Sequence, residues 1–147
     1  MNIEISNLQF TYPAGVQALF GVSLNINAGE QVAIVGQNGA GKTTLVKHLN
    51  GLLGPTSGYV RIEDWDTKEH SVSKIARRVG YVFQNPDEQL FSKNVGTEVA
   101  FGPKNLGYSS EQIQALVKDS LGMTELADKT ETNPYDLSPT WRKMVAI

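Results

Sequence analysis

Residues 36–43 have the types and the spacing of a phosphate-binding loop. The run fits the pattern G-x-x-x-x-G-K-[ST] and reads Gly36-Gln37-Asn38-Gly39-Ala40-Gly41-Lys42-Thr43. The glycines let the backbone curl until several N–H groups point at one centre, and a helix that starts near Lys42 adds the positive end of its dipole. Lys42 would reach the β- and γ-phosphates, and the Thr43 hydroxyl would bind a magnesium ion that bridges them. The spacing therefore predicts a site for a nucleoside triphosphate.

Two elements must hold this loop in place. Residues 31–35 precede it and are predicted to form a parallel strand that is buried on both faces. Residues 42–49 follow it with apolar side chains at helical spacing, which predicts an amphipathic helix. This order of strand, loop and helix is the context that the pattern requires, and it disfavours the alternative of a glycine-rich turn without a ligand.

The rest of the chain is predicted to complete an α/β fold. Apolar alternation and turn residues predict an antiparallel pair of strands, a third short strand, a helix and a second buried strand, at residues 3–10, 19–26, 59–62, 71–78 and 79–83. From residue 85 the pattern is helical, with a capping box at Ser109 and Gln112. We treat residues 1–147 as one domain, with a β-subdomain and phosphate-binding core over about 1–84 and a helical subdomain over about 85–147.

Two further side chains are candidates for contact with the nucleotide. Tyr12 ends the first strand ahead of a proline-glycine turn, where its ring could stack on a planar base; an ordinary strand-end aromatic is the alternative. Gln84 follows the buried strand at 79–83, and the carboxyl ends of parallel strands face the ligand crevice of an open α/β sheet. Its amide could bind magnesium and orient a water molecule, although polar residues often end strands.

Other polar residues have simpler interpretations. Asp87 and Glu88 could act as a general base, but acidic residues just after Asn85-Pro86 are more typical of a helix start. His48 and His70 have no partner at metal-ligand spacing, which favours a core or solvated role.

Composition narrows the class of protein. A formal net charge of -2 and a pI near 5.7 argue against the strongly basic surface that is typical of a nucleic-acid-binding protein. Cysteine is absent, so disulfides and thiolate metal sites are excluded, and a cytosolic setting is favoured. The N-terminus lacks a signal-peptide pattern and no apolar run reaches membrane-span length, so we expect membrane contact only through a partner.

Four segments together resemble the nucleotide-binding subunit of an ABC transporter. They are Phe10-Thr11-Tyr12-Pro13, the loop at 36–44, Gly54-Pro55-Thr56-Ser57-Gly58, and Gln84. Residues 83–91 and 98–103 resemble most closely the energy-coupling-factor and cobalt-importer ATPases of this family.

The resemblance implies a P-loop NTPase fold, with an antiparallel β-subdomain, a partial parallel core sheet and a helical signature subdomain. It also implies ATP and magnesium as cofactors. ATP would be bound by Tyr12, Gln37, Asn38, Gly39, Ala40, Gly41, Lys42, Thr43, Thr44 and Gln84. Lys42 and Gln84 would take catalytic roles, and Thr43 and Gln84 would bind the metal.

The signature segment departs from the family. Where the family has Leu-Ser-Gly-Gly-Gln, this chain reads Leu137-Ser138-Pro139-Thr140-Trp141. In the family's dimer this segment contacts the ATP held by the opposite subunit, and only Ser138 keeps its residue type. Pro139 has no N–H to donate, although proline suits the first turn of a helix. We therefore expect a normal helix start with a weakened ligand function.

The resemblance also places the family's catalytic glutamate and the remaining strands of its core sheet beyond Ile147. We therefore expect very slow hydrolysis by these residues alone, and unpaired sheet edges that favour association.

These observations lead to a main hypothesis and an alternative. The main hypothesis is the ATP-binding subunit of an importer of a vitamin or a transition-metal ion. It would work as a homo- or heterodimer with another ABC ATPase subunit, on a transmembrane coupling subunit, at the cytoplasmic face of the plasma membrane. The alternative is a non-hydrolysing, regulatory nucleotide-binding module that pairs with an intact ATPase. A chromosome-maintenance ATPase ranks below both, because no sustained heptad is seen.

Overall fold

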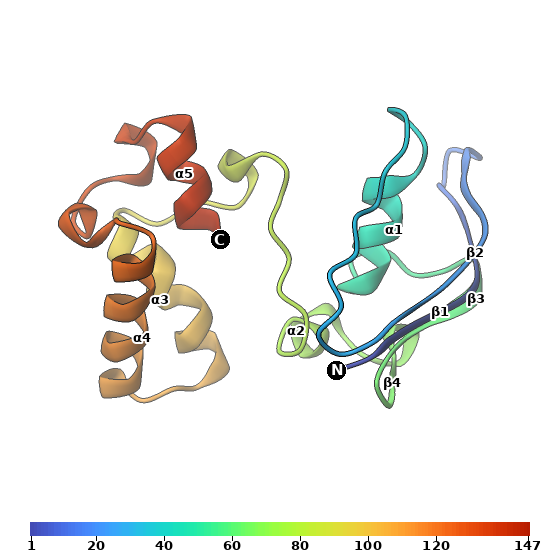
Figure 1. Cartoon of the computed structure of the whole chain (residues 1–147), viewed down its shortest axis with the longest axis horizontal. Coiled ribbons are helices and arrows are strands. Elements are labelled where there is room, and N and C mark those ends of the chain that lie inside the picture. The colour runs from blue at the N-terminus through green and yellow to red at the C-terminus, as the bar shows by residue number, and fades with distance from the viewer. The chain divides into compact units, whose positions relative to one another are not determined.

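The computed structural model describes residues 1–147 and divides them into two compact units (Figure 1). The first comprises Met1–Tyr81 and the second Val82–Ile147, so the division falls three residues before the expected boundary at 84/85. No helix is both long and apolar enough to cross a membrane. The two units are described in turn.

An antiparallel sheet forms most of the first unit. Its strands are β1 (Ile3–Thr11), β2 (Gln17–Ile26), β3 (Ser57–Ile62) and β4 (Trp65–Asp66), and their order across the sheet is β2-β1-β3-β4. Ile5 of β1 lies opposite Leu24 of β2 and Val60 of β3. Both pairings shift in register near Asn7, whose φ is 44°, so the first strand is irregular at this point.

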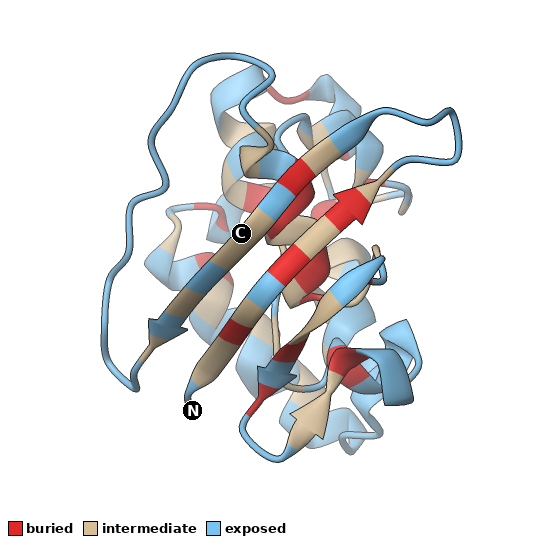
Figure 2. Cartoon of the chain, turned by 90° about the vertical axis from the view of Figure 1, so that its right-hand side faces the viewer, coloured by how far each residue is buried: buried red, intermediate tan, exposed pale blue.

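One face of this sheet packs against helix α1 (Lys42–Leu49). Buried positions alternate with more exposed ones along the strands, as a period of two requires (Figure 2). The buried cluster consists of Ile5, Leu8, Phe10, Leu19, Leu45 and Val60. Each large apolar side chain in such a cluster contributes about 1.5–3 kcal/mol through burial. This packing fixes the helix that follows the phosphate-binding loop.

The two predicted parallel strands are absent, which corrects the expectation of a parallel core sheet. Residues 31–35 and 79–83 are irregular, and every paired strand in the structure is antiparallel. Val35 is 87% exposed, whereas a strand of a parallel sheet is covered on both faces. A strand is defined by a ladder of hydrogen bonds to a neighbouring strand, and the ladders of this sheet join only β1, β2, β3 and β4. The predicted helix at 71–78 is also shorter: after η1 (Thr67–Glu69), α2 covers only Val72–Ile75.

The second unit is helical, as expected. Its elements are η2 (Pro86–Glu88), α3 (Val95–Leu106), α4 (Ser110–Met123), η3 (Ala127–Lys129), η4 (Pro134–Asp136) and α5 (Pro139–Ala146). The capping box at Ser109 and Gln112 is confirmed, with both reciprocal hydrogen bonds present. The core of this unit comprises Leu90, Val95, Leu121, Leu126, Leu137, Val145 and Ala146.

Candidate nucleotide-binding site

The phosphate-binding loop ends at the first turn of α1, as predicted. Gly41 is the N-cap residue, with φ 86°, and has no side chain to cap the helix. The first backbone N–H groups of an α-helix have no partner within the helix, so here they are available to an anion. Residues 36–40 are exposed, which leaves the loop open to solvent. The main chain thus presents hydrogen-bond donors where a phosphate group would lie.

Lys42 folds back over the loop that precedes it. Its Nζ atom donates to the carbonyl oxygens of Gly36 and Gln37, both at 2.8 Å. Charged donors make stronger hydrogen bonds than neutral ones, so the ammonium group ties the start of the loop to the helix that follows it. The same cation is positioned to attract an anionic phosphate to the loop.

Tyr12 and Thr44 connect the first strand to α1. The Tyr12 hydroxyl and Thr44 Oγ1 are 2.9 Å apart and share a hydrogen bond. The Tyr12 ring also meets Phe10 edge to face, with ring centroids 4.8 Å apart. Tyr12 remains 37% exposed, whereas Thr44 is buried, so part of the aromatic surface is accessible to a planar ligand. The structure therefore brings the predicted stacking residue to the helix that carries the loop.

Thr43 is the predicted metal ligand within the loop. Its side chain is exposed, unlike that of its neighbour Thr44, and its hydroxyl is engaged in no hydrogen bond. A single hydroxyl suits Mg2+, which usually keeps several waters and binds few protein ligands beside substrate phosphates. The structure contains no cluster of three or more His, Cys, Asp or Glu side chains that could hold a metal by themselves. The available oxygen therefore fits a magnesium ion that is bound together with a nucleotide.

Gln84 lies in the second unit, in an exposed segment just before η2. It borders an open cavity of about 520 Å3 together with residues of η2 and α5. Because no strand forms at residues 79–83, the geometric argument that placed Gln84 at a strand end does not hold in this structure. Its assignment as a nucleotide and metal ligand rests on the family resemblance.

Asp87 and Glu88 belong to a helix start, as their preferred interpretation predicted. They occupy the first turn of η2, while the Asn85 side chain accepts the capping hydrogen bond from the Asp87 N–H. The Asp87 carboxylate pairs with Arg142 of α5, at 2.9 Å, and Arg142 also donates to the Leu137 carbonyl. Asp87 therefore links η2 to α5.

Residues 137–141 form the start of α5. Ser138 is the N-cap residue, Pro139 occupies the first turn, and the Ser138 side chain makes no capping hydrogen bond. Trp141 stands where the family has a glutamine, and its indole ring packs against the core of the second unit. The expected ordinary helix start is confirmed, and the exposed Ser138 hydroxyl remains available to a ligand.

His48 is connected to the candidate site, and the sequence alone did not predict this connection. It lies fully buried in α1, and its Nδ1 is 2.7 Å from the carbonyl oxygen of Thr44. Burial lowers the pKa of the His48 imidazole, while the backbone of Thr44 and Gly54 opposes this effect, so the ring is neutral near pH 7. A separation of four residues from Thr44 on one helix face was the available signal.

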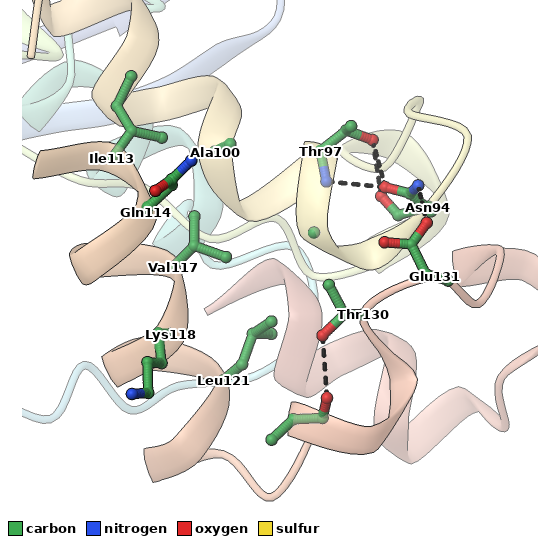
Figure 3. Close-up of a pocket in the computed structure, with 12 residues that line it drawn as sticks. Asn94, Thr97, Ala100, Ile113, Gln114, Val117, Lys118, Leu121, Thr130 and Glu131 are labelled. Atoms are coloured by element: carbon green, nitrogen blue, oxygen red, sulfur yellow. Dashed lines mark hydrogen bonds between the residues drawn. The ribbon is translucent and has the colours of Figure 1, made fainter. Parts of the chain in front are cut away.

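A separate pocket lies between α3 and α4. It has a volume of about 580 Å3, with Ala100, Ile113, Val117 and Leu121 on its apolar side (Figure 3). Asn94 caps α3 at its border and also donates to Glu131. None of the predicted nucleotide or metal ligands lines this pocket.

Comparison with known proteins gives a consistent picture. The ABC transporter family profile matches residues 19–147. An energy-coupling factor transporter ATP-binding protein, EcfA, from Methanosphaera stadtmanae is 44% identical over 147 residues, covering 99% of this chain and 53% of the relative. A putative ABC transporter ATP-binding protein from Pyrococcus horikoshii, PH0132, is 47% identical over 145 residues, covering 99% of this chain and 55% of the relative. The chain spans about half the length of the curated relatives it matches.

Solved structures support the same assignment. The structure of cbiO1 from Clostridium perfringens, part of the ABC transporter complex cbiONQ, has a TM-score of 0.85 and 34% identity, covering 98% of this chain and 58% of that one. A dimeric structure of the ATP-binding cassette MJ0796, bound to ADP and Pi, has a TM-score of 0.85 and 28% identity, covering 98% and 66%. These likenesses confirm the P-loop NTPase fold class and the resemblance to energy-coupling-factor ATPases. The chain therefore belongs to the ABC transporter family, and it is similar to the ATP-binding subunits EcfA and cbiO1 over about half of their length.

Proposed function

We propose that this chain binds ATP as part of an ABC-type ATP-binding subunit, which couples ATP hydrolysis to the uptake of a vitamin or a transition-metal ion. One observation carries the proposal. The Tyr12 hydroxyl bonds Thr44 at the first turn of α1, so an accessible aromatic ring lies at the N-terminal end of the helix that follows the open phosphate-binding loop. This arrangement suits a ligand that has both a planar base and a triphosphate.

Each residue of the loop has a separate task in this proposal. The uncapped N–H groups at the start of α1 would bind phosphate oxygens, and Lys42 would exchange its loop carbonyls for the β- and γ-phosphates. When bound, magnesium would neutralise charge on these phosphates, and Thr43 and Gln84 would hold it. Tyr12 would stack on the adenine and so favour ATP over the bare triphosphate.

The relatives support the transport role and the partners. EcfA is an energy-coupling factor transporter ATP-binding protein, cbiO1 is part of a transporter complex, and MJ0796 is dimeric with ADP and Pi bound. By analogy, the chain would pair with a second ATPase subunit and contact a transmembrane coupling subunit. It would then lie at the cytoplasmic face of the plasma membrane. The family's catalytic glutamate has no counterpart assigned in these 147 residues, so we propose that hydrolysis needs groups outside them.

The start of α5 supports a second candidate, a non-hydrolysing regulatory module. Pro139 offers no N–H at the first helical turn, and Trp141 is committed to the core of its unit. Such a helix would contact a partner's ATP only through Ser138 and the remaining N–H groups. In this candidate the chain binds nucleotide and its partner subunit performs hydrolysis.

Titration of the protein with ATP and Mg2+ tests the proposed binding function. We expect magnesium-dependent binding that Lys42→Ala abolishes, and Tyr12→Ala should weaken ATP more than inorganic triphosphate. Binding that is insensitive to Lys42→Ala would refute the site. Measurement of phosphate release, with and without the sequence that the longer relatives possess, separates the two candidates. Turnover restored by that sequence supports the ATPase, and its continued absence supports the regulatory module.

A further inference from the structure

The Tyr12 ring, which we propose to stack on adenine, belongs to a closed ring of contacts among four residues of the first unit. Thr44 bonds the Tyr12 hydroxyl, and the Tyr12 ring meets Phe10 edge to face. Phe10 in turn meets His48 edge to face, with centroids 4.7 Å apart, and His48 returns to the Thr44 carbonyl at 2.7 Å. The ring of contacts thus joins the end of β1 to the helix that follows the phosphate-binding loop.

The His48 imidazole is held in one orientation within this ring of contacts. A carbonyl oxygen can only accept, so Nδ1 carries the hydrogen and donates to Thr44. His48 is fully buried, and its Nδ1 bond to Thr44 is the hydrogen bond that orients the ring, while the backbone of Gly54 also interacts with the imidazole. Rotation of the imidazole would break this bond and also move the surface that supports Phe10.

The side chain of Tyr12, by contrast, is held by two contacts. Its hydroxyl bonds Thr44, and one side of its ring rests against Phe10, while 37% of the residue remains exposed. Both supports lead back to His48, which bonds the backbone of Thr44 and packs against Phe10. A change at His48 therefore affects both contacts that orient the Tyr12 ring.

We propose that His48 is a positioning residue for adenine recognition, which acts through Thr44 and Phe10 on the Tyr12 ring. This inference rests on the proposed function and deepens it, because it assigns base preference to a buried residue that touches no nucleotide. Phosphate binding depends instead on the main chain and Lys42, at the start of the same helix. His48 should consequently affect the base-dependent part of affinity and spare the phosphate-dependent part.

The experiment compares the dissociation constants of ATP and inorganic triphosphate, both with Mg2+. The loss of an aromatic contact of this kind weakens an affinity by up to about tenfold, so His48→Leu should lower the preference for ATP over triphosphate by about 3–10-fold. Affinity for triphosphate should stay within about twofold of wild type. His48→Asn keeps a donor near the Nδ1 position, and we expect it to retain part of the preference.

Two further variants distinguish positioning from a general structural role. In a Tyr12→Ala background the stacking ring is absent, so His48→Leu should cause no further loss of ATP preference. His70→Leu is the matched control: the other histidine of the chain packs on Trp65, outside this ring of contacts, and should leave the preference unchanged. Circular dichroism checks folding, and if His48→Leu does not fold, His48→Asn carries the same test.

Equal weakening of ATP and triphosphate by the His48 variants would overturn the inference, as would an equal loss of preference with and without Tyr12. An unchanged preference in a folded His48→Leu protein would overturn it as well. If the wild-type protein binds triphosphate but shows no preference for ATP, the inference about His48 is wrong, whereas the proposed phosphate site is supported. If the wild-type protein binds neither ligand, the proposed function fails and the inference fails with it.

Discussion

Replacement of Gly41 by alanine tests whether the phosphate-binding loop is shaped by its contact with the sheet. Gly41 has φ 86°, and a Cβ there would lie 2.6 Å from the Ala18 carbonyl oxygen and 3.0 Å from Leu19 Cδ2. Both neighbours belong to β2, which is held by pairing with β1. The backbone carbonyl cannot yield as a flexible side chain would, so α1 must move away from the sheet.

Gly29 provides a matched control for this change. Its φ is 82°, nearly that of Gly41, but a Cβ there would meet no atom within 4 Å. Left-handed backbone costs an L-residue about 1–2 kcal/mol, and both alanine variants incur this cost. Overpacking costs a further 1–3 kcal/mol, roughly, and only Gly41→Ala incurs it.

Urea unfolding of the two variants measures the difference. We expect Gly41→Ala to lower the free energy of unfolding by about 1–3 kcal/mol more than Gly29→Ala does. Gly41→Ala should also weaken ATP binding, because the first turn of α1 is displaced, whereas Gly29→Ala should not. Equal destabilisation by the two variants would show that contact with β2 does not shape the loop, and the argument for a packed loop would be wrong.

Four further predictions concern single side chains. Lys42→Met should lower ATP affinity at least tenfold, roughly, because it removes the cation and both hydrogen bonds that hold the loop; isothermal titration checks this. Burial lowers the pKa of His48 in the folded state below its ordinary value of 6.5, so the unfolded chain binds more protons and stability falls as pH drops below about 6.5. The slope reaches at most about 1.4 kcal/mol per pH unit, and His48→Asn should flatten it in urea unfolding between about pH 5 and 7. Gln89→Leu should cost about 1–3 kcal/mol in the same assay, because it removes hydrogen bonds to Ala146 and Phe83, while Asp87→Asn should cost less than about 1 kcal/mol, since its pair with Arg142 is partly exposed.

Elements that depend on neighbours in sequence were predictable. The helix at 42–49, the strands near 3–10 and 19–26 and the capping box at Ser109 and Gln112 all appear, because side-chain period and local hydrogen bonds decide them. The phosphate-binding loop belongs to this group: its glycines and Lys42 act within about eight residues of one another. These patterns were sufficient to identify the fold class and the family.

The tertiary structure decided what depends on partners far away in sequence. Residues 31–35 and 79–83 have strand-like composition, yet neither forms a strand, because pairing requires a neighbouring strand that no local pattern provides. The contact of Tyr12 with Thr44, 32 residues away, likewise depends on how α1 packs against the sheet. Sequence by itself determined which groups could bind a triphosphate, through residue type and short-range spacing. The packing of helices and strands determined which of those groups come into contact, because residues far apart in sequence meet only when the core brings their elements together.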